Sequence, residues 1–213
     1  MAKHRAEPAS QKIYNQIKQD IIDGVFEENE ILTERTLVES YKVSRTPIKE
    51  ALKILAAEGW VEILPRSTTR VTPFGKKEFR DVLQIRLALE SMGATLAATK
   101  VDGEDARKLR EMAEQFQDPA VLADSARYGR LDHDFHFLML KISGNAKLVD
   151  LMKIISSSYQ RITKRSLMQP RRNEESAREI LNVIECILDH NPIGASNRIV
   201  QHILNSADKA GVL

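Results

Sequence analysis

The pattern of hydrophobic positions changes at about residue 73. In the first stretch, short helical patterns lead into two runs that alternate between apolar and polar residues, 60–64 and 69–72, around a predicted hairpin tip at 65–68. In the second stretch, long helical patterns follow one another with almost no strand signal. We therefore predict a mainly α protein with two domains, residues 1–73 and residues 74–213.

Helix breakers divide the second stretch, and they are Gly103, Pro119, the Ser-Gly-Asn run at 143–145, Pro170 and Pro192. The helices predicted between them span 76–99, 103–117, 119–126, 128–143, 145–167, 173–189 and 193–209. This second domain is therefore expected to be an all-helical bundle of six or seven helices.

Residues 33–58 read as two short helices joined by a tight turn, and a further helix is predicted before them from Ser10 to about Asp23. Thr33 and Ser44 are the expected N-caps of the pair, because their side chains can accept hydrogen bonds from free backbone amides. The pattern is typical of a helix-turn-helix, and the alternating hairpin after it makes the predicted domain a winged helix-turn-helix.

A helix-turn-helix that reads DNA places the first turn of its second helix in the major groove. That turn carries Arg45, Thr46 and Lys49, which can bond guanine edges or phosphates. Arg66 and Arg70 lie in the hairpin, within expected reach of phosphates or of the minor groove. From the helix pair alone, DNA binding and an ordinary solvated basic face stay equally open.

Residues 11–73 resemble the DNA-binding domain of the GntR family of bacterial transcription regulators. The matching segments are IYNQIKQDIIDG, ILTERTLVESYKVSRTPIKEALKILAAEGWVEILP and RV, and the run SRTPIKEAL is the most specific. The resemblance implies operator contacts from Arg35, Arg45 and Lys49, although the family usually has Arg at the last position and Gly where Thr68 stands. The full predicted reading surface is Arg35, Ser44, Arg45, Thr46, Lys49, Arg66, Thr68 and Arg70.

Composition narrows the class of protein. The hydrophobic fraction of 42% is ordinary for a globular chain, and no apolar run approaches the roughly 18 residues that span a bilayer. The first residues, MAKHRAEPAS, carry no apolar stretch of a secretory signal, and the lone Cys186 is expected as a reduced core thiol, which fits the bacterial cytoplasm. The net charge is only +2, but eight Lys or Arg accompany four Glu from Arg35 to Lys76, which favours phosphate attraction.

The predicted bundle contains candidate metal ligands. Asp132 and His136 lie four residues apart, on one face of one helix, and His202 lies on the last helix, which could pack alongside. A carboxylate and imidazoles at this spacing can hold a divalent metal ion, whereas His133 points away from that face. The alternative is structural, since a lone histidine inside a bundle is often a hydrogen-bonded core residue.

The segments VLQIRLALESMGATLAA and LDHDFHFLMLKISGNAKLVDLM are similar to the FadR-type C-terminal domain called FCD, an effector-binding and dimerising bundle, in its shorter VanR-like branch. The resemblance implies a site of one Asp and three His for an ion of the Zn, Ni or Mn type. Asp132, His136 and His202 match three of these positions, and Ile180 stands at the fourth.

Three forms of the site stay open: a metal held by three protein ligands and completed by water, one completed by an effector carboxylate, or a metal-free pocket in which His136, His202 and Arg86 bind an anion. A planar guanidinium suits a carboxylate, so Arg86 is the predicted effector contact; an intrahelical pair with Glu90 is its alternative.

These features predict a ligand-responsive transcription regulator, by family default a repressor, that binds a pseudo-palindromic operator as a homodimer and responds to a small organic acid. The alternatives are a regulator for which the metal ion is itself the effector, a DNA-binding protein with a vestigial pocket, and a metal-dependent hydrolase. Because no clear second carboxylate accompanies the predicted ligands, we expect a regulator and not an enzyme.

Overall fold

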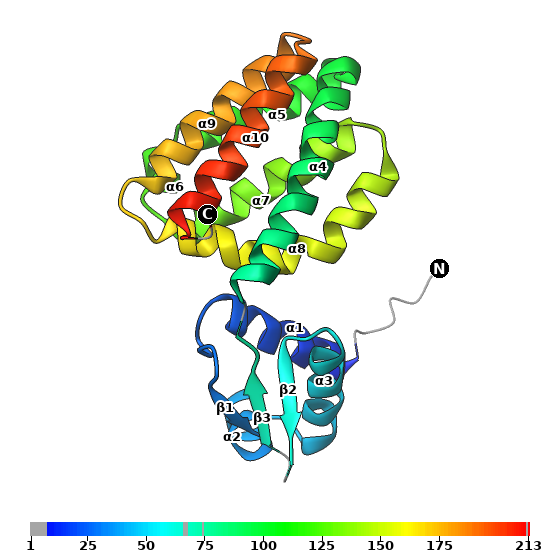
Figure 1. The fold of residues 1–213 in the computed structure, drawn as a ribbon, viewed down its shortest axis with the longest axis vertical. Coiled ribbons are helices and arrows are strands. Elements are labelled where there is room, and N and C mark those ends of the chain that lie inside the picture. The colour runs from blue at the N-terminus through cyan, green and yellow to red at the C-terminus, as the bar shows by residue number, and fades with distance from the viewer. Residues whose placement is uncertain (1–7, 66–67, 74, 212) are drawn as a thin grey trace. The chain divides into compact units, whose positions relative to one another are not determined.

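The computed structural model describes residues 8–65, 68–73, 75–211 and 213 of the chain. They form two compact units, Met1–Gly75 and Lys76–Leu213 (Figure 1). Each unit has a hydrophobic core of its own. The mainly helical fold class and the winged helix-turn-helix followed by a helical bundle are confirmed.

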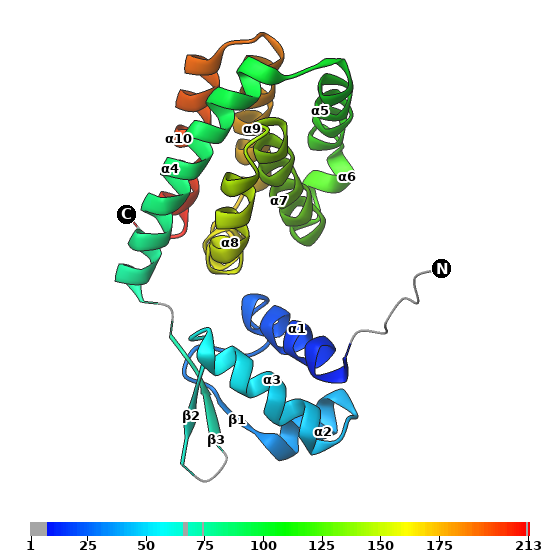
Figure 2. The same cartoon turned by 90° about the vertical axis from the view of Figure 1, so that its right-hand side faces the viewer.

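The first unit contains α1 (Ala9–Ile22), β1 (Ile31–Thr33), α2 (Glu34–Tyr41), α3 (Arg45–Ala57), β2 (Val61–Leu64) and β3 (Thr68–Val71). Helices α2 and α3 are the helix pair, and the hairpin of β2 and β3 follows α3 directly (Figure 2). The backbone of Asn29 takes the left-handed conformation, with φ of 68°. Helix α1 begins at Ala9, one residue before its predicted start at Ser10, and Pro8 precedes it without a side-chain cap, so Ser10 does not cap this helix.

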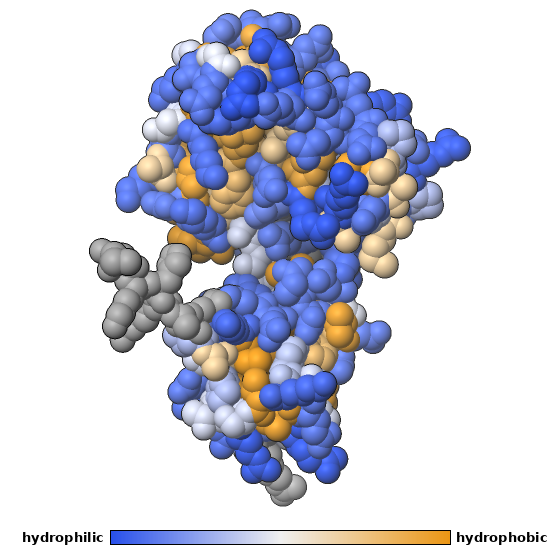
Figure 3. All heavy atoms as spheres, turned by 180° about the vertical axis from the view of Figure 1, so that it is seen from behind, coloured by the Kyte–Doolittle hydropathy of each residue, from blue (hydrophilic) through white to orange (hydrophobic). Residues whose placement is uncertain are grey.

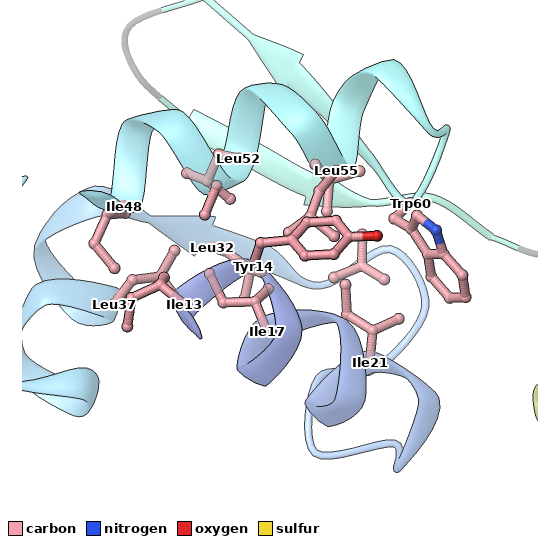
Figure 4. Close-up of a cluster of buried hydrophobic side chains, with 13 residues drawn as sticks. Ile13, Tyr14, Ile17, Ile21, Leu32, Leu37, Ile48, Leu52, Leu55 and Trp60 are labelled. Atoms are coloured by element: carbon pink, nitrogen blue, oxygen red, sulfur yellow. The ribbon is translucent and has the colours of Figure 1, made fainter. Parts of the chain in front are cut away.

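The core of the first unit lies between α1 and α3, whose apolar stripes face each other (Figure 4). The stripe of α3 consists of Ile48, Ala51, Leu52 and Leu55, and that of α1 of Ile13, Tyr14, Ile17 and Ile21. Burying each of the larger aliphatic side chains contributes about 1.5–3 kcal/mol. This packing orients α3, so that its opposite face remains in solvent.

The two predicted N-caps of the helix pair behave differently. The Oγ1 of Thr33 accepts a hydrogen bond from the amide of Thr36 at 3.2 Å, which confirms it as the cap of α2. Ser44 holds the N-cap position of α3 with an extended backbone, but its side chain makes no capping bond. Its hydroxyl is therefore free of that role at the start of α3.

The sheet is antiparallel, in the order β1-β3-β2, and β1 was not predicted. Three residues are too few to show an alternating pattern, so only pairing with β3 makes Ile31–Thr33 a strand. Thr68 was placed at the hairpin tip, which is wrong, because it pairs with Thr33 and Leu64 as the first residue of β3. Arg66 lies outside the described residues.

The described residues of the second unit form seven helices: α4 (Lys76–Lys100), α5 (Gly103–Phe116), α6 (Pro119–Leu122), α7 (Ser125–Ile142), α8 (Ala146–Leu167), α9 (Arg172–Leu188) and α10 (Pro192–Lys209). The predicted boundary between 119–126 and 128–143 is wrong. Asp124 accepts hydrogen bonds at 3.0 Å from the amides of Ala126 and Arg127, so it ends the short α6 region and starts α7.

Helix α4 packs against α7, α8, α9 and α10, and α10 also packs against α9 (Figure 2). This arrangement places residues of α4, α7, α9 and α10, which are separated in the sequence, in one interior. Cys186 of α9 was expected to be buried in the core, but it is only half-buried. None of the helices in the described part of the chain has the length and apolar character needed to cross a membrane.

Candidate functional site

The exposed face of α3 carries the predicted reading residues. Ser44, Arg45, Thr46 and Lys49 are all exposed, on the side of the helix away from its buried stripe. The arrangement leaves donors suited to phosphates and base edges in solvent at the start of one rigid helix. In the view of Figure 3, hydrophilic side chains cover much of the surface of both units.

Three basic residues of the predicted reading surface, one each on α2, α3 and β3, are already in ion pairs. Lys49 Nζ lies 3.7 Å from Glu34 Oε2, and Arg35 Nε lies 3.9 Å from Glu39 Oε1. In the wing, Arg70 donates to Glu62 at 2.5 Å across the β2–β3 pair. Exposed pairs of this kind contribute about 0–1 kcal/mol, so exchanging them for phosphate contacts costs little.

The second unit buries a polar cluster, in which Asp132 and His136 of α7 meet His202 of α10. All three are fully buried, and one ligand atom from each lies within 4.8 Å of the other two. Nε2 of His136 lies 3.8 Å from one Asp132 oxygen, and Nε2 of His202 lies 3.7 Å from the other. The structure thus brings together three residues that the sequence placed on two separate helices.

Two glutamates hold the imidazoles of this cluster. Nδ1 of His136 bonds to Glu90 of α4, and Nδ1 of His202 bonds to Glu179 of α9 at 2.8 Å. Burial by itself would raise the pKa of Glu90, but the charge of Arg86 and the hydrogen bonds from His136 and Arg86 outweigh it and lower the pKa to about 2. A carboxylate with this pKa is ionised and accepts only, so Nδ1 of His136 carries the proton.

Glu179 is held ionised beside His202, as Glu90 is beside His136. Burial opposes ionisation of Glu179, yet hydrogen bonds from His202 and Arg172 lower the pKa of that carboxyl to about 2. Burial also lowers the pKa of His202, which keeps its ring neutral. Nε2 of each ring then lies on the inner side of the cluster, near the carboxylate of Asp132.

Arg86 of α4 completes the wall of the site. Its Nε bonds to Glu90, its terminal nitrogen donates to Nε2 of His136 at 2.8 Å, and its guanidinium carbon lies 4.1 Å from the Tyr159 ring centroid. The intrahelical pair with Glu90, the alternative expected for this residue, is therefore present, together with a contact to a predicted ligand.

A second buried arginine, Arg172, pairs with Glu179. Both of its terminal nitrogens donate to the Glu179 carboxylate, at 2.9 and 2.8 Å, and one of them also donates to Ser206 at 2.9 Å. Asn205 donates to the same carboxylate at 2.7 Å. The sequence analysis did not identify Arg172 or Glu179 as part of the site. The available signal was their separation of seven residues, which places them on one face of α9.

The donors present fit a divalent cation. One carboxylate and two imidazoles converge, and both rings are oriented by carboxylates, as in known metal sites. The charged side chains nearby are the guanidinium groups of Arg86 and Arg172 and the carboxylates of Glu90, Asp132 and Glu179. The three carboxylates outnumber the two guanidinium groups by one, which leaves a negative charge beside the rings for a cation to balance.

The fourth position of the family pattern and two other histidines of this domain add no ligand. Ile180 is fully buried in α9 and has no donor atom. His133 bonds to the Tyr159 hydroxyl at 3.0 Å, and His190 bonds to the carbonyl of Ala98 at 3.0 Å. The described part of the chain therefore offers Asp132, His136 and His202 as ligands, which leaves further coordination positions to water or to a bound molecule.

A winged helix-turn-helix joined to a bundle with a buried ligand site defines the class of one-chain, ligand-dependent DNA-binding regulators. Residues 9–71 match the family of bacterial regulatory proteins called the gntR family, and residues 81–205 match the FCD domain. The chain belongs to the GntR family and carries an FCD domain. Its family is one of transcription regulators and not of enzymes.

Individual relatives agree with this assignment. The chain is 26% identical over 192 residues to the uncharacterized HTH-type transcriptional regulator YdhC of Bacillus subtilis, covering 90% of this chain and 86% of that protein. It is 30% identical over 162 residues to the gluconate operon transcriptional repressor of Bacillus licheniformis, covering 70% and 65% respectively. The solved structure of Escherichia coli McbR/YncC shares the fold, with a TM-score of 0.79 at 17% identity over 96% of this chain and 98% of that one.

Proposed function

We propose that this regulator binds a pseudo-palindromic operator as a homodimer in the bacterial cytoplasm and that a small organic acid in the FCD domain controls its affinity for DNA. The observation that carries the proposal is the buried convergence of Asp132, His136 and His202 inside a helical unit joined to a DNA-reading unit. Repression is the action expected, because a relative of this chain is a transcriptional repressor.

In the first unit, the proposed contacts follow from exposure. Arg45 and Lys49 on α3 face guanine edges or phosphates in the major groove, and Ser44 and Thr46 bond phosphates. Arg35 on α2, and Arg66, Thr68 and Arg70 in and beside the wing, contact the flanking backbone or the minor groove. Two such surfaces, related by the two-fold axis of a dimer, match two operator half-sites.

In the second unit, Asp132, His136 and His202 hold one divalent ion of the Zn, Ni or Mn type. A bound ion supplies a fixed positive charge that attracts a carboxylate into an otherwise buried site. Arg86 offers a second contact for the same carboxylate, because its planar guanidinium can bond two oxygens. A relative is named for the gluconate operon, which supports an organic acid as the class of effector.

A metal ion acting alone as the effector is the second candidate. It is favoured by one observation, that the three donors and the glutamates that orient two of them all come from this chain. The two functions differ in one measurable respect: an ion that acts alone changes DNA affinity in buffer that contains no organic acid.

The DNA-binding part is tested by enriching bound sequences from a randomised DNA library and then measuring affinity for the enriched duplex by fluorescence anisotropy. Arg45→Ala is expected to weaken binding by about 1–3 kcal/mol. Arg107→Ala, which removes an exposed arginine of α5, is the matched control and should bind as the parent does. Equal affinity of the Arg45→Ala variant and the parent would refute the docking of α3.

The effector part is tested with the metal content of untagged protein, followed by thermal-shift screening of small carboxylic acids with and without Zn²⁺. Near-stoichiometric metal in the parent and little in His202→Ala supports the three-ligand site. An acid that stabilises the parent and also changes operator affinity supports the proposal. Stabilisation by acids that is the same without metal and in His202→Ala would contradict a metal-dependent effector site.

A further inference from the structure

The contact between Arg86 and His136 involves the one nitrogen that a metal ion would need. An imidazole nitrogen has a single lone pair in the ring plane, and it can accept a hydrogen bond or bind a metal, but not both. Glu90 already fixes the proton on Nδ1 of His136, so Nε2 is the only ligand atom of that ring. The terminal nitrogen of Arg86 donates to this Nε2 at 2.8 Å.

Arg86 is held firmly in this place. Its side chain is only 3% exposed, it pairs with Glu90 one helical turn away, and its guanidinium lies over the Tyr159 ring. These contacts compensate the cost of burying the charge, so the guanidinium is part of the wall of the site. A divalent ion bound to His136 would both displace this donor and lie close to a like charge.

His202 presents a different situation. Its Nδ1 bonds to Glu179, as Nδ1 of His136 bonds to Glu90, but its Nε2 faces the carboxylate of Asp132 at 3.7 Å. The second buried arginine, Arg172, contacts Glu179 and the hydroxyls of Ser166 and Ser206. The two halves of the site therefore each contain a buried Arg–Glu pair beside a histidine, but only Arg86 bonds to a ligand nitrogen.

We propose that Arg86 and a divalent metal ion compete for Nε2 of His136, so that Arg86 keeps the metal affinity of the site low until an anion engages its guanidinium. The inference rests on the metal site of the proposed function and adds its regulation. A carboxylate that bonds Arg86 turns the guanidinium away from His136 and frees Nε2. Metal and acid then strengthen each other's binding, and by linkage each does so by the same factor.

The test compares Zn²⁺ affinity by isothermal titration calorimetry in the full-length parent and in two double variants. Arg86→Met with Glu90→Gln removes the competing donor and keeps a side-chain oxygen for Nδ1 of His136. Arg172→Met with Glu179→Gln makes the same change beside His202 and is the matched control. Because a charge-assisted hydrogen bond is lost, the first variant is expected to bind Zn²⁺ roughly tenfold to a hundredfold more tightly, and the control is not.

Circular dichroism establishes that each variant is folded, and Arg86→Lys is the second variant if the first one unfolds. It keeps the charge but is shorter and lacks the fork, so it too is expected to bind Zn²⁺ more tightly than the parent. Equal or weaker binding by the Arg86 variants overturns this inference alone. No binding by the parent or by any variant overturns both the inference and the metal site of the proposed function.

The coupling to acids has its own measurement. Sodium acetate serves as the carboxylate probe, and the free Zn²⁺ concentration is corrected for its weak complex with acetate. Acetate is expected to raise the Zn²⁺ affinity of the parent and of the Arg172 control, and to leave that of the Arg86 variants unchanged. A parent that does not respond, or Arg86 variants that respond equally, overturns the coupling.

Discussion

Replacing Glu179 by alanine would remove the residue on which one side of the buried site depends. This carboxylate accepts both terminal nitrogens of Arg172, Nδ1 of His202 and the side-chain amide of Asn205. Arg172 is 1% exposed, and among the described residues it would keep only hydroxyl partners at hydrogen-bond distance. The variant therefore leaves a buried guanidinium without its nearest counter-charge, and the ring of His202 without the acceptor that orients it.

The structure sets the size of the expected loss. Breaking a buried ion pair by removing one partner typically costs about 3–5 kcal/mol. The side chain of Glu179 is 20% exposed, and Glu175 lies 3.8 Å from Arg172 and can compensate part of its charge. Both facts reduce the cost, so we expect a loss near the lower limit, about 3 kcal/mol.

The assay is urea unfolding of the full chain, monitored by circular dichroism. Helices α4–α10 of the second unit contribute most of the helical signal. Glu111→Ala is the matched control, because Glu111 pairs with Arg107 on an exposed helix surface. That variant is expected to lose no more than about 0.5 kcal/mol. Similar losses in the two variants would refute the reasoning that burial, and not pairing as such, gives Glu179 its importance.

Three further predictions concern pH, DNA affinity and the missing ligand. The folded pKa of Glu90, about 2, lies below its ordinary value of 4.5, so the stability it contributes is full above about pH 4.5 and is lost as the pH falls toward 2. Urea unfolding at pH 5 and pH 3 should therefore show a smaller decrease in Glu90→Gln than in the parent, and equal decreases would contradict the assignment. Lys49→Arg is expected to tighten operator binding by about 1 kcal/mol, because a planar fork can bond both acceptors of a guanine edge; weaker binding in anisotropy would show that the pair with Glu34 is the more important contact. Ile180→His adds a fourth donor and is expected to raise Zn²⁺ affinity at least about tenfold in calorimetry, and no change would mean that position 180 does not face the site.

Most of the fold follows from local signals in the sequence. The periodicity of Ile48, Leu52 and Leu55 predicts α3 and its buried face, because residues at this spacing share one side of any helix. The predictions failed where a boundary depends on contacts far along the chain. Strand β1 exists only because Thr33 and its two predecessors pair with β3, and Thr68 belongs to β3 for the same reason.

The candidate ligands were also readable, but their surroundings were not. Asp132 and His136 are four residues apart, and helix geometry alone places them on one face. No local rule says that Glu90, which lies on a helix far away in the sequence, bonds to His136, or that Glu179 bonds to His202. The protonation state of each ring therefore could not be inferred from the sequence.

The sequence by itself determined the class of this protein, its two structural units, the exposed basic turn of α3 and three of the metal-ligand candidates. These are properties of helical periodicity, capping and residue type, all of which act over a few neighbouring residues. Only the tertiary structure decided that Arg86 lies against Nε2 of His136 and that Arg172 supports the opposite side. The reason is physical, since the charge and hydrogen bonding of a buried site depend on every group packed around it, and those groups come from helices that meet only in the folded bundle.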